Sequence, residues 1–192
     1  MAIIFDFDKT LTKLDSITLF TFFIWRRKYV DILVIVKLLF LSLKYAFKML
    51  DNTDFKSSYF RSLKVHRNEI NLWFDEYFES HLFKGNLNMS AIFLSLTNDD
   101  NIVVVTASPA YYVSKVFPHI RVIGGELLFD KSGLCCGYQN CFGDSKSTIL
   151  LSKNINVDYV FTDSKSDMPL IKICKKEAFL VKKGFVKKVY AR

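Results

Sequence analysis

Three short apolar runs, each ending on hydroxyl or carboxylate side chains, are the feature that most constrains the fold of this chain. They occupy residues 2–7, 101–109 and 157–164 and read AIIFDF, NIVVVTASP and VDYVFTDS. Continuous apolar runs of this length are typical of parallel strands that are buried on both faces of a sheet. With helical segments between them, they predict an α/β fold with a doubly wound, mostly parallel sheet.

The segments between the runs supply the expected helices and one hairpin. Apolar residues recur at three and four positions in four segments, which predicts helices at residues 87–96, 110–117, 146–152 and 167–174. Two short apolar runs within residues 126–138 predict a hairpin, with Gly133 supplying the unusual dihedral angle of its turn. The pair Gly124 and Gly125 lacks the spacing of a dinucleotide-binding loop, and we interpret it as a turn.

A long helical segment interrupts this order after the first run. From residue 17 to residue 82 the chain has no strand-turn punctuation, and apolar residues recur at helical spacing. We therefore expect residues 1–14 and 86–192 to form the α/β core and residues 15–85 to form an inserted helical cap. Trp25 and Trp73 are expected in the interior of this cap.

One stretch of the insertion, residues 30–50, is strongly apolar. Lys37 and Lys44 divide it into shorter pieces, which disfavours a membrane-spanning helix. These two lysines and Lys48 fall on one helical face, opposite a face that contains Ile35, Leu38, Leu39 and Leu41. Such a helix either makes a peripheral contact with a membrane or buries its apolar face within the cap, and we favour burial.

Composition and charge narrow the class of protein. With 192 residues, 51% of them hydrophobic, the chain can form one well-filled domain that carries an insertion. The net charge of +8 is concentrated near the C-terminus, where we interpret it as a solvated face and tail. No nucleic-acid-binding signature accompanies the charge, so we expect no nucleic-acid partner. The four cysteines lack metal-ligand spacing and no secretory signal is recognisable, which indicates reduced thiols and a cytoplasmic protein.

Parallel strands bring polar side chains from distant parts of the chain to one crevice, at the carboxyl ends of the strands. The expected set consists of Asp6, Asp8, Thr106, Ser108, Lys146, Asp163 and Asp167. Carboxylates that face one another are unstable unless they hold a cation, and an all-oxygen set suits Mg²⁺. The sequence therefore predicts a magnesium site whose candidate ligands are Asp6, Asp8, Asp163 and Asp167.

The same residues fit phosphoryl transfer. A carboxylate can attack phosphorus to give an aspartyl-phosphate, which splits one difficult displacement into two easier ones. Thr106, Ser108 and Lys146 are candidates to bind the negative oxygens of the phosphoryl group. Asp8 lies two positions after Asp6, on the same side of an extended chain, and can protonate the leaving oxygen and later activate water.

The chain resembles the haloacid dehalogenase superfamily. The resemblance lies in DFDKT, VVVTASP, Lys146 and TDSKSD, whose order and spacing agree across nearly the whole chain. It implies that Asp6 is the nucleophile, that Asp8 is the general acid/base, and that Thr106 and Lys146 hold the phosphoryl group.

The resemblance also implies a ligand set for the metal. Asp163 would bind Mg²⁺ together with Asp6 and the backbone carbonyl of Asp8, and Asp167 would support the metal from nearby.

A helical insertion directly after the first motif is similar to the phosphoserine-phosphatase-like branch, whose small helical cap closes over the site. NCFGDSKSTIL and TDSKSDMPLI also resemble a bacterial subgroup that includes phosphatidylglycerophosphatase C-like proteins. Phosphoserine phosphatases carry a glutamate where this chain has Asp15 and an asparagine where it has Ser166. Both departures weigh against phosphoserine as the substrate.

Three further residues have open roles. Asp15 is a candidate for substrate contact in the cap, but an Asp-Ser pair before an apolar helical run is equally a helix N-cap. Arg61 is a candidate to reach a substrate carboxylate or phosphate, although a solvated cap face suits it better. Lys9 either lends positive charge to the carboxylates or points away.

We expect a Mg²⁺-dependent phosphomonoester hydrolase that works through an aspartyl-phosphate. Because the predicted cap is apolar and basic, its substrate is expected to be a lipid-linked or membrane-proximal phosphate ester at the inner face of the membrane. Two alternatives stay open. One is a phosphatase of a soluble metabolite, phosphoserine or a sugar phosphate, and the other is a non-catalytic membrane-peripheral protein that keeps the scaffold.

Overall fold

The computed structural model describes residues 1–88, 101–182 and 185–191. Within these residues the strands form one seven-stranded sheet of order β4-β3-β2-β1-β5-β6-β7. The strands are β1 (Ala2–Phe5), β2 (Ile102–Pro109), β3 (Arg121–Phe129), β4 (Cys135–Gln139), β5 (Val157–Thr162), β6 (Glu177–Lys182) and β7 (Phe185–Ala191). All neighbours pair in parallel except β4 and β7, the antiparallel edge strands. The predicted mostly parallel α/β fold is confirmed.

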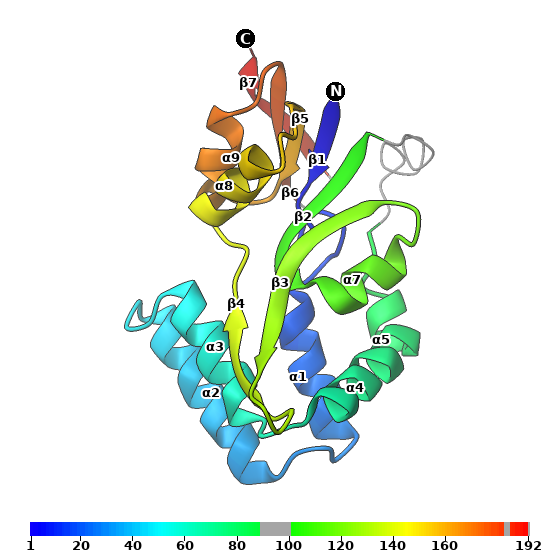
Figure 1. Cartoon of the computed structure of the whole chain (residues 1–192), viewed down its shortest axis with the longest axis vertical. Coiled ribbons are helices and arrows are strands. Elements are labelled where there is room, and N and C mark those ends of the chain that lie inside the picture. Colours follow the sequence, from blue (N-terminus) through cyan, green and yellow to red (C-terminus); the bar gives the residue numbers. More distant parts are fainter. Residues whose placement is uncertain (89–100, 183–184, 192) are drawn as a thin grey trace.

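Helices cover both faces of this sheet (Figure 1). On one side lie α8 (Asp144–Ser152) and α9 (Met168–Lys172), and on the other lies α7 (Ala110–Val116). A 3₁₀ turn, η1 (Lys165–Asp167), precedes α9. These elements confirm three of the four predicted helices, whereas most of the fourth, at residues 87–96, lies outside the described residues.

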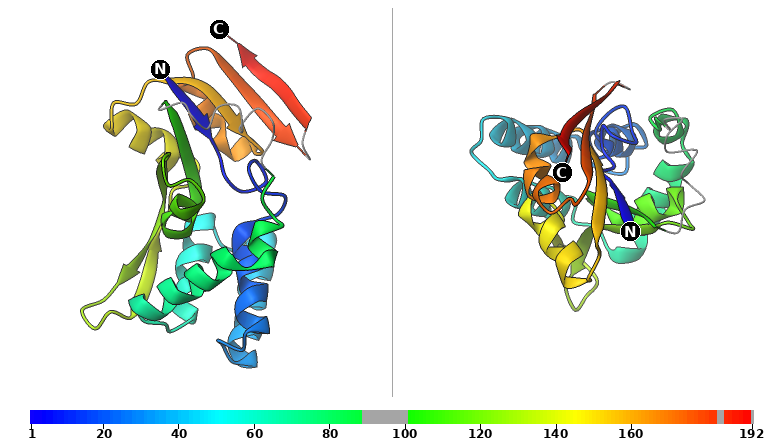
Figure 2. Two further views of the ribbon diagram at one scale, coloured as in Figure 1. Left: turned by 90° about the vertical axis from the view of Figure 1, so that its right-hand side faces the viewer. Right: turned by 90° about the horizontal axis from the view of Figure 1, so that it is seen from above.

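Five helices follow β1 and gather beyond the carboxyl ends of the central strands (Figures 1 and 2). They are α1 (Ser16–Arg26), α2 (Ile32–Ala46), α3 (Asn52–Ser62), α4 (Arg67–Glu79) and α5 (His81–Lys84). The helical period seen in the sequence marks their buried face, because Tyr59, Phe60, Trp73 and Tyr77 are all buried. Trp25 departs from the prediction, since 49% of its side chain is exposed at the end of α1.

Helix α2 also departs from the prediction. Of its residues, Ile35 and Leu38 are buried, but Leu39 on the expected apolar face is 57% exposed. The helix has apolar residues around most of its circumference, so packing one side leaves another side open. None of the described helices is long and apolar enough to span a membrane.

The hairpin of β3 and β4 joins the sheet to the helical segment. Gly133 closes its turn with φ of +82°, as predicted, and the backbone of Cys135 donates to the Val65 carbonyl at 2.9 Å. Tyr138 of β4 stacks on Phe60 of α3, with ring centroids 4.9 Å apart. Helix α3 is thereby packed directly against the hairpin.

Gly124 and Gly125 lie inside β3, so their interpretation as a turn is wrong. Position 125 requires a glycine for steric reasons, because a Cβ atom there would lie 1.9 Å from the Tyr138 hydroxyl oxygen. Tyr138 is buried there and donates a hydrogen bond of 2.7 Å to the Ala107 carbonyl. The glycine thus gives the tyrosine ring its place against the strand.

The two chain segments that connect the sheet with the helices are paired with each other. Thr12 and Leu87 form an antiparallel bridge, and the Lys13 amide donates to the Asn86 carbonyl at 2.8 Å. The Asn86 side chain adds hydrogen bonds to the backbone nitrogen and carbonyl of Leu14, at 2.8 and 3.1 Å. The outgoing and returning segments are therefore held as one unit.

Two of the C-terminal lysines lie on a strand rather than in a tail, and their side chains are exposed, as expected for a solvated face. Lys187 and Lys188 lie in β7, which pairs with β6 and forms the edge of the sheet. Lysine is common on edge strands because it discourages pairing with a further chain. The sequence FVKKVYA has no strict alternation, so its period did not indicate a strand.

We expect Gly125→Ala to destabilise the protein by about 1–3 kcal/mol, because the new methyl group would overlap a buried ring that cannot rotate away. Urea unfolding measures the change. Gly137→Ala is the matched control, since its nearest neighbour is a serine hydroxyl at 3.3 Å that can move. Equal stability of the two variants would contradict the steric explanation.

Candidate active site

A buried lysine joins two carboxylates at the carboxyl edge of the sheet. Lys146, in the first turn of α8, donates to Asp6 Oδ1 at 2.7 Å and to Asp167 Oδ2 at 2.9 Å. Its side chain is 3% exposed. Burial alone would lower the pKa of Lys146, but the two carboxylates outweigh burial and raise it. The lysine is therefore held in its charged form.

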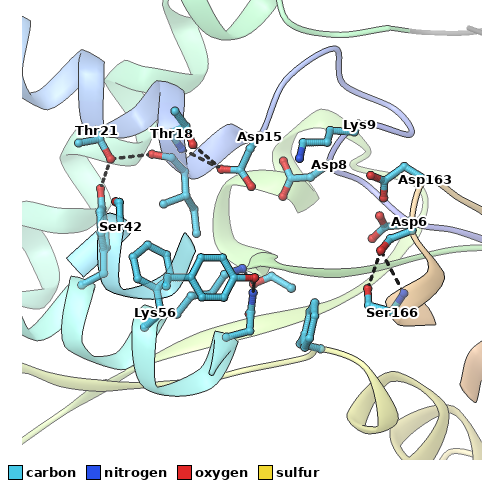
Figure 3. A pocket seen from close by; sticks show the side chains of 18 of the residues that line it. Asp6, Asp8, Lys9, Asp15, Thr18, Thr21, Ser42, Lys56, Asp163 and Ser166 are labelled. Carbon is cyan, nitrogen blue, oxygen red and sulfur yellow. Dashed lines mark hydrogen bonds between the residues drawn. The ribbon is translucent and has the colours of Figure 1, made fainter. Parts of the chain in front are cut away.

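Asp6 follows β1 directly and is 6% exposed. Its pKa is raised to about 6, mainly by burial, which Lys146 opposes and the nearby carboxylates of Asp167 and Asp163 reinforce. Asp163 follows β5, and its pKa is also raised by burial, while Lys9 acts to lower it. Figure 3 shows Asp6, Asp8 and Asp163 on one side of the pocket with Lys9 beside them. The open question about Lys9 is thus answered by its position at the site.

Asp8 is held from two directions. The backbone N–H of Ser16, the first residue of α1, donates to Asp8 Oδ1 at 2.7 Å, and Ser108 Oγ donates to Asp8 Oδ2. Burial raises the pKa of Asp8 to about 6, and the Asp15 carboxylate adds to this effect. A carboxyl group with a pKa near 6 can hold or release a proton close to neutral pH.

A chain of hydroxyl groups extends from Asp8 into the interior. Ser16 Oγ lies 3.1 Å from Ser108 Oγ and 2.6 Å from the hydroxyl oxygen of Tyr112, which is fully buried. Hydroxyl groups can act as donor or acceptor, so this chain can reverse its direction. It can therefore satisfy Asp8 both with and without a proton.

These carboxylates line a pocket of about 640 Å³, which lies between the carboxyl ends of the strands and the helical segment. Its charged wall contains Asp6, Asp8, Asp15, Asp163, Asp167, Lys9, Lys56 and Lys146. Its helical wall contains seven apolar or aromatic residues, Ile17, Phe22, Trp25, Ile35, Tyr45, Phe55 and Tyr59, interspersed with the polar residues Thr18, Thr21, Ser42 and Asn52. A pocket of this size with one polar end suits a small molecule that has a charged group and an apolar part.

Lys56 of α3 is a pocket residue that the sequence did not indicate. Its side chain is buried, and Nζ donates to the Ala107 carbonyl at 2.6 Å. Burial lowers its pKa, while the charges of Asp8 and Asp15 act to raise it. In the sequence it is one lysine of a polar helix, and no local motif distinguishes it from a surface residue.

The remaining predicted site residues take different positions. Asp15 lines the pocket and also caps α1, because its Oδ1 accepts from the Thr18 backbone at 2.9 Å. Thr106 and Ser108 are fully buried behind the pocket wall, where Thr106 Oγ1 accepts from the Ser108 amide at 2.9 Å. Arg61 does not line the pocket, and its Nε donates instead to the Cys136 carbonyl at 3.0 Å.

Comparison with known proteins identifies the family of the chain. The family model described as haloacid dehalogenase-like hydrolase matches residues 3–172. The chain belongs to this family. The expected enzyme class, a hydrolase of the haloacid dehalogenase superfamily, is thereby confirmed, whereas no curated protein matches the chain.

Several solved structures share the fold at low sequence identity. A protein of unknown function from Bordetella pertussis Tohama I is 18% identical, with a TM-score of 0.74 over 89% of this chain and 85% of its own. A substrate-bound phosphoserine phosphatase is 15% identical, with a TM-score of 0.60 over 95% of this chain and 87% of its own. Cytosolic 5'-nucleotidase IIIB bound to cytidine is 18% identical, with a TM-score of 0.59 over 90% of this chain and 68% of its own.

The oxygen atoms of the site fit the divalent cation that the haloacid dehalogenase-like fold implies. Asp6 and Asp163 line the pocket, and Asp167 Oδ1 is buried without a hydrogen-bond partner. Among the described residues, no three His, Cys, Asp or Glu side chains are grouped as a metal cluster. Mg²⁺ does not require such a cluster, because it is often bound by one or two carboxylates and retains several water molecules.

We expect the free energy of unfolding to depend on pH through protonation of the Asp8 carboxyl group. In the presence of a chelator, folding keeps Asp8 protonated up to about pH 6, whereas the unfolded chain releases this proton near its ordinary pKa of 3.8. The stability from this group is present below pH 3.8 and is lost as the pH rises to about 6. Between pH 4 and pH 6, the free energy of unfolding of Asp8→Asn should therefore rise relative to that of wild type by on the order of 2 kcal/mol. Urea unfolding of both proteins across this pH range measures the change.

Asp158→Asn is the matched control, because Asp158 is a buried aspartate at the other end of β5 that accepts from the Ala2 amide. A parallel profile for Asp8→Asn and wild type would contradict the raised pKa.

Proposed function

We propose that the protein is a Mg²⁺-dependent phosphatase that cleaves phosphomonoesters through an aspartyl-phosphate on Asp6. The observation that carries this proposal is the ion-paired arrangement of Asp6, Lys146 and Asp167 at the end of the polar pocket. A nucleophilic carboxylate needs a positive charge nearby when it meets an anionic phosphoryl group. Lys146 supplies that charge, 2.7 Å from Asp6 Oδ1.

In the first step a carboxylate oxygen of Asp6 forms a bond to phosphorus, and the bond from phosphorus to the ester oxygen breaks. Asp8 gives its proton to the leaving oxygen, which departs as an alcohol. In the second step Asp8 takes a proton from water, the water oxygen attacks phosphorus, and the bond to Asp6 breaks. Inorganic phosphate leaves, and both aspartates return to their starting states.

The hydroxyl chain supports this role of Asp8. Because Ser108, Ser16 and Tyr112 can reverse their hydrogen bonds, gain and loss of the Asp8 proton need no movement of the carboxyl group. We assign the magnesium site to Asp6, Asp163 and the Asp8 carbonyl. The bound ion would supply charge neutralisation for the phosphoryl oxygens.

We also propose that residues 15–85 act as a cap and that residues 1–14 and 86–192 act as the catalytic core. The cap supplies the apolar wall of the pocket, and the core supplies its carboxylates and Lys146. In this architecture the substrate is chosen mainly by the cap.

The apolar wall favours a phosphate ester with an apolar part, such as a lipid-linked or membrane-proximal ester. Phe22, Trp25, Ile35 and Phe55 together line the end of the pocket that lies on the helices. The four cysteines are unpaired, which agrees with a cytoplasmic enzyme acting at the inner face of a membrane. A soluble metabolite such as phosphoserine or a sugar phosphate is the second candidate, favoured by the charged side chains of Asp15 and Lys56, which line the same pocket.

We expect Asp6→Asn to lower kcat on a soluble aryl phosphate by about 10⁴-fold or more and to remove labelling of the protein by a labelled phosphate ester. A chelator should remove wild-type activity, and added Mg²⁺ should restore it. Asp158→Asn, which changes a buried aspartate outside the pocket, is the control and should retain activity and labelling. Activity that survives in Asp6→Asn would rule out the mechanism.

We expect Lys56→Met to raise KM for anionic esters by about tenfold while changing kcat less, because it removes a buried positive charge from the pocket wall. Steady-state kinetics with aryl phosphates that do or do not carry a carboxylate measure the effect. Arg61→Met is the control, since Arg61 lies on the same helix but outside the pocket. If both variants change KM equally, Lys56 has no specific role in binding.

A further inference from the structure

Helix α2 presents an apolar face that no other described element covers. Ile32, Val36, Leu39, Phe40, Leu43 and Phe47 are each between 56% and 75% exposed. We call these six residues the α2 face. Ile35 and Leu38, on the other side of the helix, are buried against the rest of the helical segment. An exposed apolar surface of this kind marks a site of interaction.

Charge identifies the kind of partner that this face suits. Lys37 and Lys44 lie beside the α2 face, and residues 32–50 contain no aspartate or glutamate. Arg26 at the end of α1 and the two residues after it, Arg27 and Lys28, are also basic, and Arg27 pairs with Glu76 at 3.7 Å. An apolar strip with a cationic border matches the interface of an anionic bilayer, which offers hydrocarbon and negative headgroups together. A second copy of the chain would bring a second cationic border and is therefore a poorer match.

The α2 face lies on the same helix as part of the pocket lining. Ile35 and Tyr45 of α2 line the pocket, as do Phe22 and Trp25 of α1. The last two are 43% and 49% exposed, with ring centroids 5.7 Å apart, so the pocket reaches the surface beside them. An apolar surface therefore lies next to the entrance of the pocket.

We propose that the α2 face and its lysines dock on the surface of an anionic lipid bilayer. Docking places the entrance between α1 and α2 close to the headgroups. The consequence for catalysis rests on the proposed function, because an ester held in the bilayer then reaches the carboxylates of the core without crossing bulk water. The docking itself depends on the surface alone.

Flotation with vesicles tests the proposal. The wild-type protein should bind vesicles of phosphatidylglycerol and phosphatidylcholine, bind pure phosphatidylcholine vesicles much less, and lose part of its binding at high salt. The double variant Leu39→Gln/Leu43→Gln should lower the partition coefficient by about tenfold for each leucine. Leu151→Gln is the matched control, because Leu151 is 58% exposed on α8, and it should bind like wild type.

Lys37→Gln/Lys44→Gln separates the two contributions. It should weaken binding to anionic vesicles, by about fivefold for each lysine, and leave the weak binding to neutral vesicles unchanged. Failure of the wild type to bind anionic vesicles would overturn the proposal, as would equal binding by the double leucine variant and Leu151→Gln. A dimer that Leu39→Gln/Leu43→Gln dissociates, without vesicle binding, would assign the face to a second copy and also overturn it.

The same variants distinguish this proposal from the proposed function. Leu39 and Leu43 lie outside the pocket lining, so Leu39→Gln/Leu43→Gln should hydrolyse a soluble aryl phosphate like wild type when vesicles are absent. Vesicle binding without any hydrolysis would leave the docking surface in place and reject the phosphatase. Hydrolysis without vesicle binding would reject the docking surface alone.

Discussion

The ion pairs of Lys146 with Asp6 and Asp167 are the interaction on which the rest of the site depends. They join the end of β1, the start of α8 and the turn before α9, three segments that the sequence separates widely. Removing one partner from such a buried group leaves an uncompensated charge, at a cost of about 3–5 kcal/mol. The parallel sheet makes the arrangement possible, because it brings the ends of β1 and β5 to one edge.

Much of this could be predicted from the sequence, because buried parallel strands and their polar ends are local patterns. Asp6, Asp8, Asp163 and Asp167 were expected at one pocket and lie there. The hydroxyl chain and Lys56 were not foreseen, since each depends on how the helical segment packs against the sheet and its hairpin. That packing is set by contacts between distant segments, such as Phe60 on Tyr138, and no local spacing records it.

The errors have a similar origin. A periodic pattern states which residues of a helix are apolar, but the neighbours of the helix decide which of them are covered. Trp25 and Leu39 were expected in the interior and are about half exposed, because the helical segment is too small to cover α1 and α2 on all sides. Gly125 was interpreted as part of a turn, although its conformation is extended and its role is to make room for a ring. The C-terminal strands were missed because neither EAFLVK nor FVKKVYA alternates apolar and polar residues.

The pairing of the two connecting segments has a consequence for how ligands exchange. Asn86 and Leu87 tie the returning segment to the outgoing one, and the hairpin of β3 and β4 is bonded to the other end of the helical segment. Lifting the helices as a body would break both sets of hydrogen bonds. Exchange through the open side of the pocket beside Phe22 and Trp25 would leave both sets of hydrogen bonds intact, for water as well as for a ligand. A site that stays open to water suits hydrolysis, whereas an enzyme that passes its phosphoryl group to another acceptor must exclude it.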